Sequence, residues 1–273
     1  MIRQNLHTHS TFSDGENTCG EIVLAAIQKG FTSIGFSEHA YTPYDSECCI
    51  KEYDIPRYFA EVHHLKKKFE GQIEVFLGFE CDYHHNTEKT GLDYTIGSAH
   101  YILDEATGDY LNIDGVPENY KQALSRVAGG YIEELVRIYY SNVIKMAREY
   151  KPDIIGHFDI ITKLNEGNRY FDPKSAWYRR IAREAAGRIA ETGCIVEVNT
   201  GGICRGATET TLPSPEILQE LFDLHVPVTV SSDSHTADSL DFWFSQAEEL
   251  LKKTGWRSIK QLTADGFIDI EIG

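Results

Sequence analysis

The 273-residue sequence lacks several features that mark common classes of protein. No apolar run approaches the roughly 20 residues of a membrane span, and the histidine-containing start forms no apolar signal core. Six cysteines without a C-x-x-C pair match neither a disulfide framework nor a zinc ribbon. Linker-like, low-complexity and repeated segments are also missing. We therefore expect one large domain, residues 1–273, in the cytoplasm and with reduced cysteines.

Positive charge is scarce. The chain has 26 Lys and Arg against 42 Asp and Glu, a formal net charge of −16. Proteins that bind nucleic acids neutralise backbone phosphates with clustered Lys and Arg, so this balance argues against a nucleic-acid partner. Part of the acidity serves solubility, and it is compatible with a small substrate that carries positive charge. The expected partner is a small molecule, with no membrane contact, and the oligomeric state stays open.

Short apolar runs recur along the chain, and each ends at a polar residue. The first extended segment carries His7 and His9 two residues apart, a spacing that aims both imidazoles at one face, and Asp14 follows. The later runs cover residues 33–37, 73–79, 94–99, 153–156, 194–198 and 226–232. The polar residues that end them are Glu38, His39, Glu80, His100, His157, Asn199, Asp233 and His235. Any one of these histidines alone would be read as a core or surface residue; the recurrence indicates a shared site.

Helical patterns separate the apolar runs. They cover residues 21–29, 56–70, 131–150, 172–192, 213–224 and 239–250. Alternating strands and helices with polar residues at the strand ends are typical of a parallel α/β barrel, whose active site lies at the carboxyl ends of the strands. A polar, glycine-interrupted segment at 104–130 is predicted to be an insertion after the fourth strand, placed where it could cover a substrate.

The set of motifs resembles the PHP (polymerase and histidinol phosphatase) superfamily and, at finer grain, its histidinol-phosphatase branch. The resemblance covers essentially the whole chain and is carried by His7-Thr8-His9 with Asp14, Ser37-Glu38-His39, Gly78-Phe79-Glu80, Ser98-Ala99-His100, Gly156-His157, Glu197-Val198-Asn199 and Asp233-Ser234-His235. It implies a distorted (β/α)7 barrel, TIM-barrel-like, that holds up to three divalent ions of zinc, manganese or iron.

The same resemblance implies how the metal ligands are shared. His7, His9, Glu80 and Asp233 would hold one ion, and Glu80, His100 and His157 a second. Asp14, His39 and His235 would hold a third. Mixed imidazole and carboxylate ligands suit several divalent metals, so the native ion is left open.

This chemistry points to a metal-dependent phosphomonoesterase. A phosphate monoester dianion repels hydroxide; metal ions offset that repulsion and lower the pKa of bound water. Asp233 and His235 are the candidates to protonate the leaving alkoxide. The leading substrate is L-histidinol phosphate, in histidine biosynthesis. Alternatives are another small phosphate ester or phosphotyrosine, an amidohydrolase-type barrel, and a metal-binding barrel without catalysis.

Three further residues are candidates for substrate binding. Arg205 lies in a glycine-containing loop after the sixth strand, and Arg169 lies in the loop after the fifth. A guanidinium is planar and always charged, so it can bind two phosphate oxygens, although either residue could instead be a surface arginine. We expect Arg205 to bind phosphate rather than support the fold. Glu38, beside His39, is the first candidate to pair with the ammonium group of histidinol.

Overall fold

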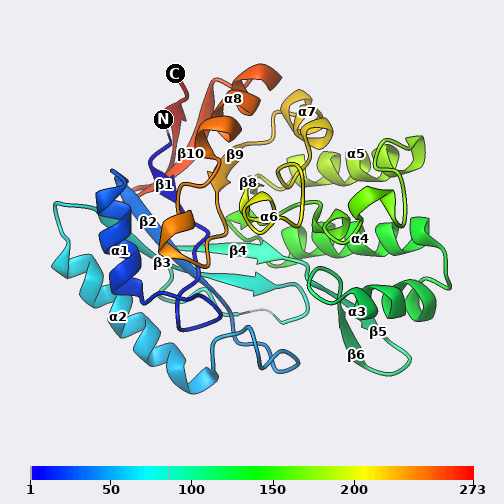
Figure 1. Ribbon diagram of the computed structural model, residues 1–273, viewed down its shortest axis with the longest axis horizontal. Coiled ribbons are helices and arrows are strands. Elements are labelled where there is room, and N and C mark those ends of the chain that lie inside the picture. The colour runs from blue at the N-terminus through cyan, green and yellow to red at the C-terminus, as the bar shows by residue number, and fades with distance from the viewer. Residues whose placement is uncertain (1, 86) are drawn as a thin grey trace.

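Seven parallel strands form the central sheet of the computed structural model, which describes residues 2–85 and 87–273 (Figure 1). Their order in the sheet is β1-β2-β3-β4-β7-β8-β9, so each strand lies beside its successor in this series. The strands are β1 Gln4–Asn5, β2 Ser33–His39, β3 Glu74–Asp82, β4 Tyr94–Ser98, β7 Ile154–Ile155, β8 Ile195–Asn199 and β9 Val228–Ser231.

The two ends of this sheet meet just beyond β1 and β9. Thr8 forms a parallel bridge with Ser234, whose carbonyl accepts a hydrogen bond from His9 N at 2.8 Å. Ser234 N donates in turn to the His7 carbonyl at 3.1 Å. The sheet is thereby nearly closed into a barrel, which confirms the predicted fold class. The two histidines follow β1 rather than lying within it, because Thr8 between them forms an isolated bridge and not a continuous ladder.

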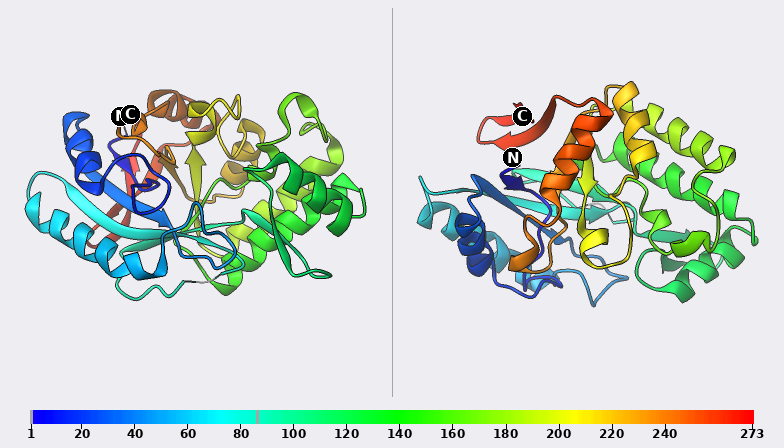
Figure 2. Two further views of the ribbon diagram at one scale, coloured as in Figure 1. Left: turned by 60° about the horizontal axis from the view of Figure 1, so that its bottom comes forward. Right: turned by 45° about the horizontal axis from the view of Figure 1, so that its top comes forward.

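Six helices cover the outside of the sheet (Figures 1 and 2). They are α1 Cys19–Gln28, α2 Ile55–Lys68, α4 Ile132–Glu149, α5 Ala176–Ala190, α7 Pro215–Asp223 and α8 Phe244–Thr254. In α4, the buried residues Leu135, Tyr139, Val143 and Met146 recur every three or four positions, which places them on one face. Apolar residues from all these helices join one core cluster with the outward faces of the strands.

The barrel interior is apolar at its base. Leu6, Phe76, Tyr94, Ile96, Ile154 and Ile195 form a separate cluster with Leu262. Side chains two positions apart on a strand point to the same side, so Glu80 and Glu197 continue the inward rows that Phe76 and Ile195 begin. The sequence therefore places apolar side chains below and ionisable side chains above within one barrel.

Two helices begin four or five residues later than the sequence predicts; the other four have boundaries within two residues of the predicted ones. The predicted helix 172–192 starts at Ala176, because the Asp172 carboxylate accepts a hydrogen bond from Lys174 N and closes a separate turn. The predicted helix 239–250 starts at Phe244. Ser239 is occupied in a hydroxyl-bonded turn with Ser234 and Thr236, so it does not cap that helix.

The segment after β4 forms a hairpin and a short helix beside α4 (Figure 1). The hairpin strands are β5 Tyr101–Asp104 and β6 Asp109–Asn112, followed by α3 Pro117–Gln122. The insertion thus begins at Tyr101, three residues before the predicted start. The Arg126 guanidinium ties it together through ion pairs with Asp104 and Asp109.

A second hairpin at the end of the chain was not predicted. It consists of β10 Ser258–Thr263 and β11 Gly266–Glu271 and lies near the first strand, so both termini are close together (Figure 2). The Gln4 side chain exchanges two hydrogen bonds of 2.8 Å with the backbone of Leu262. In the described residues, no helix has the length and apolar character needed to cross a membrane.

Candidate metal centre

Glu80, near the end of β3, lies at the centre of a cluster of histidines. Its Oε1 is 2.9 Å from His157 Nε2 and 3.3 Å from His100 Nε2. Its Oε2 is 3.1 Å from His7 Nε2 and 2.9 Å from His39 Nδ1. These imidazoles come from the ends of four different strands, which meet at the carboxyl edge of the parallel sheet. One buried carboxylate therefore contacts four histidines, as a bridging ligand must.

Asp233 extends this cluster from the end of β9. Its Oδ1 lies 3.3 Å from His9 Nε2 and 3.6 Å from His7 Nε2. Asp233 has a φ of 47°, in the left-handed region that Asp tolerates better than most residues. The loop after β8 passes close by, since a Cβ at Gly201 would lie 2.7 Å from the Ser232 carbonyl oxygen. Only glycine allows this approach.

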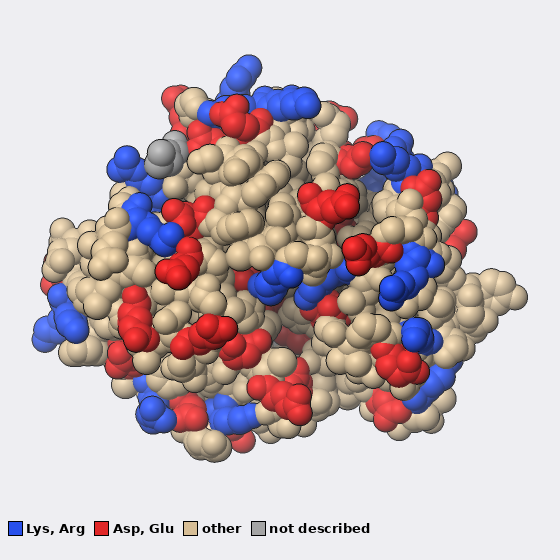
Figure 3. All heavy atoms as spheres, viewed as in Figure 1, with Lys and Arg blue, Asp and Glu red and all other residues tan. Residues whose placement is uncertain are grey.

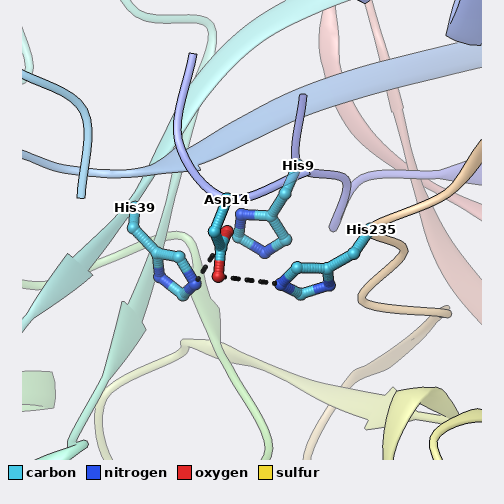
Figure 4. A group of neighbouring side chains, drawn as sticks. All are labelled: His9, Asp14, His39 and His235. Carbon is cyan, nitrogen blue, oxygen red and sulfur yellow. Dashed lines mark ion pairs between the residues drawn. The ribbon is translucent and has the colours of Figure 1, made fainter. Parts of the chain in front are cut away.

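A third group stands at the rim of the cluster (Figure 4). Asp14 lies between two imidazoles, 3.7 Å from His39 Nε2 and 3.3 Å from His235 Nε2. The rings of His9 and His39 are stacked, with their centroids 4.3 Å apart. The tight turn that carries Asp14 depends on Gly15, where a Cβ would meet the His9 carbonyl oxygen at 2.3 Å. Sequence-distant residues thus supply one compact set of nitrogen and oxygen atoms.

The arrangement fits divalent cations. Three groups offer ligand atoms within 4.8 Å of one another: His9, Asp14, His39 and His235; His7, His9 and Asp233; and His7, Glu80 and His157. His7 Nε2, both ring nitrogens of His9 and Glu80 Oε2 are buried, and although some of them lie close together, none forms a hydrogen bond within the described part of the chain. Leaving such atoms unpaired costs free energy, and a bound cation would satisfy them.

The electrostatic surroundings of His9 and Glu80 favour the protonation states that metal ligands need. Burial and the neighbouring His39 and His235 lower the pKa of His9 to about 3, which keeps that imidazole neutral, as metal binding requires. Burial alone would raise the pKa of Glu80, but His7, His39 and His100 outweigh it and hold the pKa well below its usual range. The central carboxylate is therefore ionised.

Glu197, on β8, supports the cluster from behind. Its Oε1 lies 2.7 Å from His7 Nδ1, and its Oε2 accepts hydrogen bonds from His157 N at 2.9 Å and Asn199 Nδ2 at 3.0 Å. A carboxylate behind a ligating imidazole fixes its orientation and tautomer. The sequence contains this residue in a motif, but its position as an inward-facing partner of His7 depends on a strand pairing that the sequence does not specify.

Asp82 and Ser98 are two further supporting residues that the sequence does not identify. Asp82 Oδ2 accepts a hydrogen bond from His100 N at 2.9 Å, and Ser98 Oγ donates to Glu80 Oε1 at 2.6 Å. Both lie at strand ends, on β3 and β4, and the inward alternation of those strands is the signal that could have found Ser98. They position ligands that the sequence does predict.

The structure brings all nine predicted metal ligands together, and Arg205 joins them. Arg205 Nη2 lies 2.7 Å from Asp233 Oδ2, and Nη1 donates to the Asp233 carbonyl at 2.8 Å and lies 3.2 Å from His235 Nδ1. Arg205 therefore also holds a predicted ligand in place, which adds a supporting role to the predicted one. Near the centre of the face in Figure 3 the surface is hollowed, with acidic and basic side chains around the depression.

Glu38 differs from the prediction made for it, whereas the substrate role of Arg169 stays a prediction. Glu38 is fully buried, and its oxygens accept hydrogen bonds from Ser10 N, from Ser10 Oγ at 2.6 Å and from the Ser13 hydroxyl. It supports the loop after β1, so the structure contradicts a contact with substrate ammonium. Arg169 is exposed after the turn Glu166–Asn168, and its guanidinium has no ion pair or hydrogen bond with any described residue.

Comparisons with known proteins agree with this geometry. The family model described as PHP domain matches residues 5–201. "Probable histidinol-phosphatase" of Deinococcus radiodurans is 29% identical over 95% of this chain and 95% of its own length. "Histidinol-phosphatase" of Bacillus subtilis is 26% identical over 89% of this chain and 97% of its own length.

A solved structure shares the fold. Histidinol phosphate phosphatase of Lactococcus lactis, complexed with zinc, L-histidinol and phosphate, superimposes with a TM-score of 0.73 at 23% identity over 97% of this chain and 98% of its own. Because the family model covers well over half of the chain and the predicted motifs meet at one centre, the predicted family is confirmed: the chain belongs to the PHP domain family.

Proposed function

We propose that the protein is a metal-dependent phosphomonoesterase that hydrolyses L-histidinol phosphate to L-histidinol and phosphate, as a step of histidine biosynthesis. The observation that carries this proposal is the cluster around Glu80, where nitrogen and oxygen atoms from six strand ends converge. Several buried atoms of His7, His9 and Glu80 have no hydrogen-bond partner among the described residues. The names of the relatives from D. radiodurans and B. subtilis support the same substrate.

The metal ligands are proposed as the sequence predicts them. Glu80 would be shared by two ions, one with His7, His9 and Asp233 and the other with His100 and His157. Asp14, His39 and His235 would hold a third. Divalent cations held there would neutralise phosphoryl charge and lower the pKa of bound water, and zinc, manganese and iron all suit these ligands. Zinc is the first choice, since the Lactococcus lactis structure contains it.

Arg205 is proposed to bind the phosphoryl group. Its guanidinium lies beside the cluster, and its side chain retains 36% exposure, so part of it is open to a ligand. Two of its nitrogens already hold Asp233, which fixes the direction of the planar group. A preoriented guanidinium loses less entropy when it binds phosphate oxygens. Arg169 stays the second candidate.

His235 is the better of the two candidates for protonating the leaving alkoxide. Burial would raise the pKa of Asp233, but Arg205 and His7 outweigh it and hold the pKa well below its usual range. An ionised Asp233 has no proton to donate. His235 is half-buried at the rim, where its side chain is 24% exposed and can reach a bound ester. It would act through a nitrogen that is not engaged by a metal.

Phosphate release tests the function. The protein is reconstituted with zinc, manganese or iron and assayed with L-histidinol phosphate, phosphotyrosine, a sugar phosphate and an aryl phosphate. We expect the highest kcat/KM for L-histidinol phosphate. A preference for another ester would overturn the substrate but leave the phosphatase. Amide hydrolysis without phosphate release would favour the amidohydrolase alternative, and tight metal binding without turnover would favour a non-catalytic barrel.

We also propose that the protein acts in the cytoplasm on a freely diffusing ester, without a nucleic-acid or membrane partner. The cysteine pattern and the net charge of −16 support this proposal. Fractionation of the native host, with the activity followed by phosphate release, tests the location. Activity recovered with membranes would contradict it.

A further inference from the structure

The insertion after β4 delivers one carboxylate, Asp114, to the edge of the metal centre. Ile113 N donates a hydrogen bond to the His100 carbonyl at 2.9 Å, which fastens the end of the hairpin beside a predicted metal ligand. The next residue, Asp114, lies directly after this contact. Its backbone N donates to Asn112 Oδ1 at 3.2 Å, which closes the turn after β6. The hairpin therefore fixes the position of Asp114.

Only one oxygen of the Asp114 carboxylate is paired. Oδ2 lies 3.0 Å from Lys163 Nζ, on the loop after β7. The side chain is 13% exposed, yet Oδ1 is buried and has no hydrogen-bond partner in residues 2–85 and 87–273. A buried carboxylate oxygen without a donor is costly, and a ligand that supplies the donor would remove this cost.

Asp114 is charged and lies within electrostatic range of His100, His157 and Arg205. Burial would raise its pKa, but Lys163, His100 and His157 outweigh burial and lower it to about 2. Asp114 in turn helps to raise the pKa of Arg205, so its field also reaches the proposed phosphate ligand. Within the described chain, Asp114 belongs to none of the three groups that could hold a metal ion.

A carboxylate in this place does not serve phosphate binding, since it repels a phosphoryl dianion. It does suit a substrate that carries a cation close to its phosphate. In L-histidinol phosphate the ammonium group is attached two carbons from the ester oxygen, and it brings the hydrogen-bond donors that Oδ1 lacks. We propose that Asp114 binds this ammonium group and determines specificity for phosphate esters of amino alcohols, an inference that rests on the proposed function.

The test compares two substrates that differ only in the amine. L-histidinol phosphate and imidazolylpropyl phosphate share the phosphate and the ring, and only the first has the ammonium. We expect Asp114→Asn to lower the ratio of kcat/KM for the first to that for the second by about ten- to a hundredfold, because a charge-assisted hydrogen bond is lost. Metal content is measured on the same sample and should match that of the wild type.

Two more variants separate substrate binding from a structural ion pair. Asp109→Asn is the matched control, because Asp109 belongs to the same hairpin and pairs with Arg126 at 2.7 Å, and its ratio should equal that of the wild type. Lys163→Met breaks the same ion pair as Asp114→Asn but leaves the carboxylate. We expect it to keep or raise the ratio. If Lys163→Met and Asp114→Asn lower the ratio equally, Asp114 only supports the fold and the inference is overturned.

The outcomes also distinguish this inference from the proposed function. If the wild type prefers the amine-bearing substrate and Asp114→Asn keeps that preference, Asp114 is not the ammonium ligand, while the function stands. If the wild type releases no phosphate from L-histidinol phosphate, the proposed function itself fails, and the role of Asp114 fails with it.

Discussion

Replacing Glu197 with Gln should weaken metal binding, although Glu197 is not itself a predicted metal ligand or substrate contact. The carboxylate accepts three hydrogen bonds, from the His7 imidazole, His157 N and Asn199 Nδ2, at 2.7 to 3.0 Å. Because Glu197 is fully buried, water cannot replace a lost partner. With Nδ1 of His7 donating to this carboxylate, Nε2 is directed toward Glu80 and Asp233 as the ligand atom.

The Gln amide cannot satisfy the same three donors. If its oxygen faces His7, its NH2 group opposes the N–H of His157 and the amide of Asn199. If its NH2 group faces His7 instead, the proton of that imidazole moves to Nε2 and blocks the lone pair that a cation needs. The first arrangement leaves buried donors unpaired, which costs about 1–3 kcal/mol, and the second removes the nitrogen lone pair that would bind the metal. We expect the metal affinity or kcat to fall by roughly tenfold to a hundredfold.

Chelator competition measures the metal dissociation constant, and phosphate release measures kcat in the same preparation. The matched control is Asp153→Asn, because Asp153 at the opposite end of β7 also accepts hydrogen bonds, from Thr95 N at 2.8 Å and from Thr95 Oγ1 at 3.0 Å. The control should lower thermal stability without changing metal affinity. Glu197→Gln with the metal affinity and kcat of the wild type would refute the reasoning.

Four more outcomes follow from the site. Glu80→Ala should abolish phosphate release, and elemental analysis should show that it has lost more than one metal ion per chain. A full metal complement would contradict the bridging role. Arg205→Ala should lower kcat/KM about ten- to a hundredfold, and it should also weaken metal binding because Asp233 loses its partner; Arg205→Lys should recover the metal but only part of kcat/KM. Removing metal with a chelator should lower the melting temperature, and zinc should restore it, because the cations bind only the folded chain. The ion pair of Asp114 stabilises the fold above the ordinary carboxyl pKa of about 4. This stabilisation is lost as pH falls toward the folded pKa of about 2, so denaturant unfolding of Asp114→Asn should show a weaker pH dependence in this window.

The metal ligands could be predicted because their positions depend on local chain direction. His39, Glu80 and Asp233 each follow or end an apolar run, and parallel strands bring those ends to one edge whatever the details of packing. Helix boundaries were less accurate where side chains compete with the helix. Asp172 forms its own turn, and Ser239 bonds neighbouring hydroxyls, so both proposed helix starts were wrong.

The supporting residues could not be predicted in the same way. Glu38 was placed near substrate because it precedes His39, but β-strand alternation turns its side chain to the opposite side, where Ser10 and Ser13 surround it. Side chains of adjacent residues on a strand lie on opposite faces, so they contact different surroundings. Glu197 shows the converse, since its contact with His7 joins strands 190 positions apart in the sequence.

The proposed roles also separate reaction from selection. The proposed metal ligands around Glu80 come from the ends of the barrel strands, whose pairing fixes their positions. The ions that they would hold would contact only the phosphoryl group, which every monoester shares. Asp114 comes from a hairpin that is joined to this centre by the Ile113 contact with His100 and the ion pair with Lys163. Changes in the hairpin can therefore alter which ester is bound while the strand ends keep the metal ligands in place. Relatives that share the strand-end motifs are thus expected to differ in substrate where they differ in this insertion.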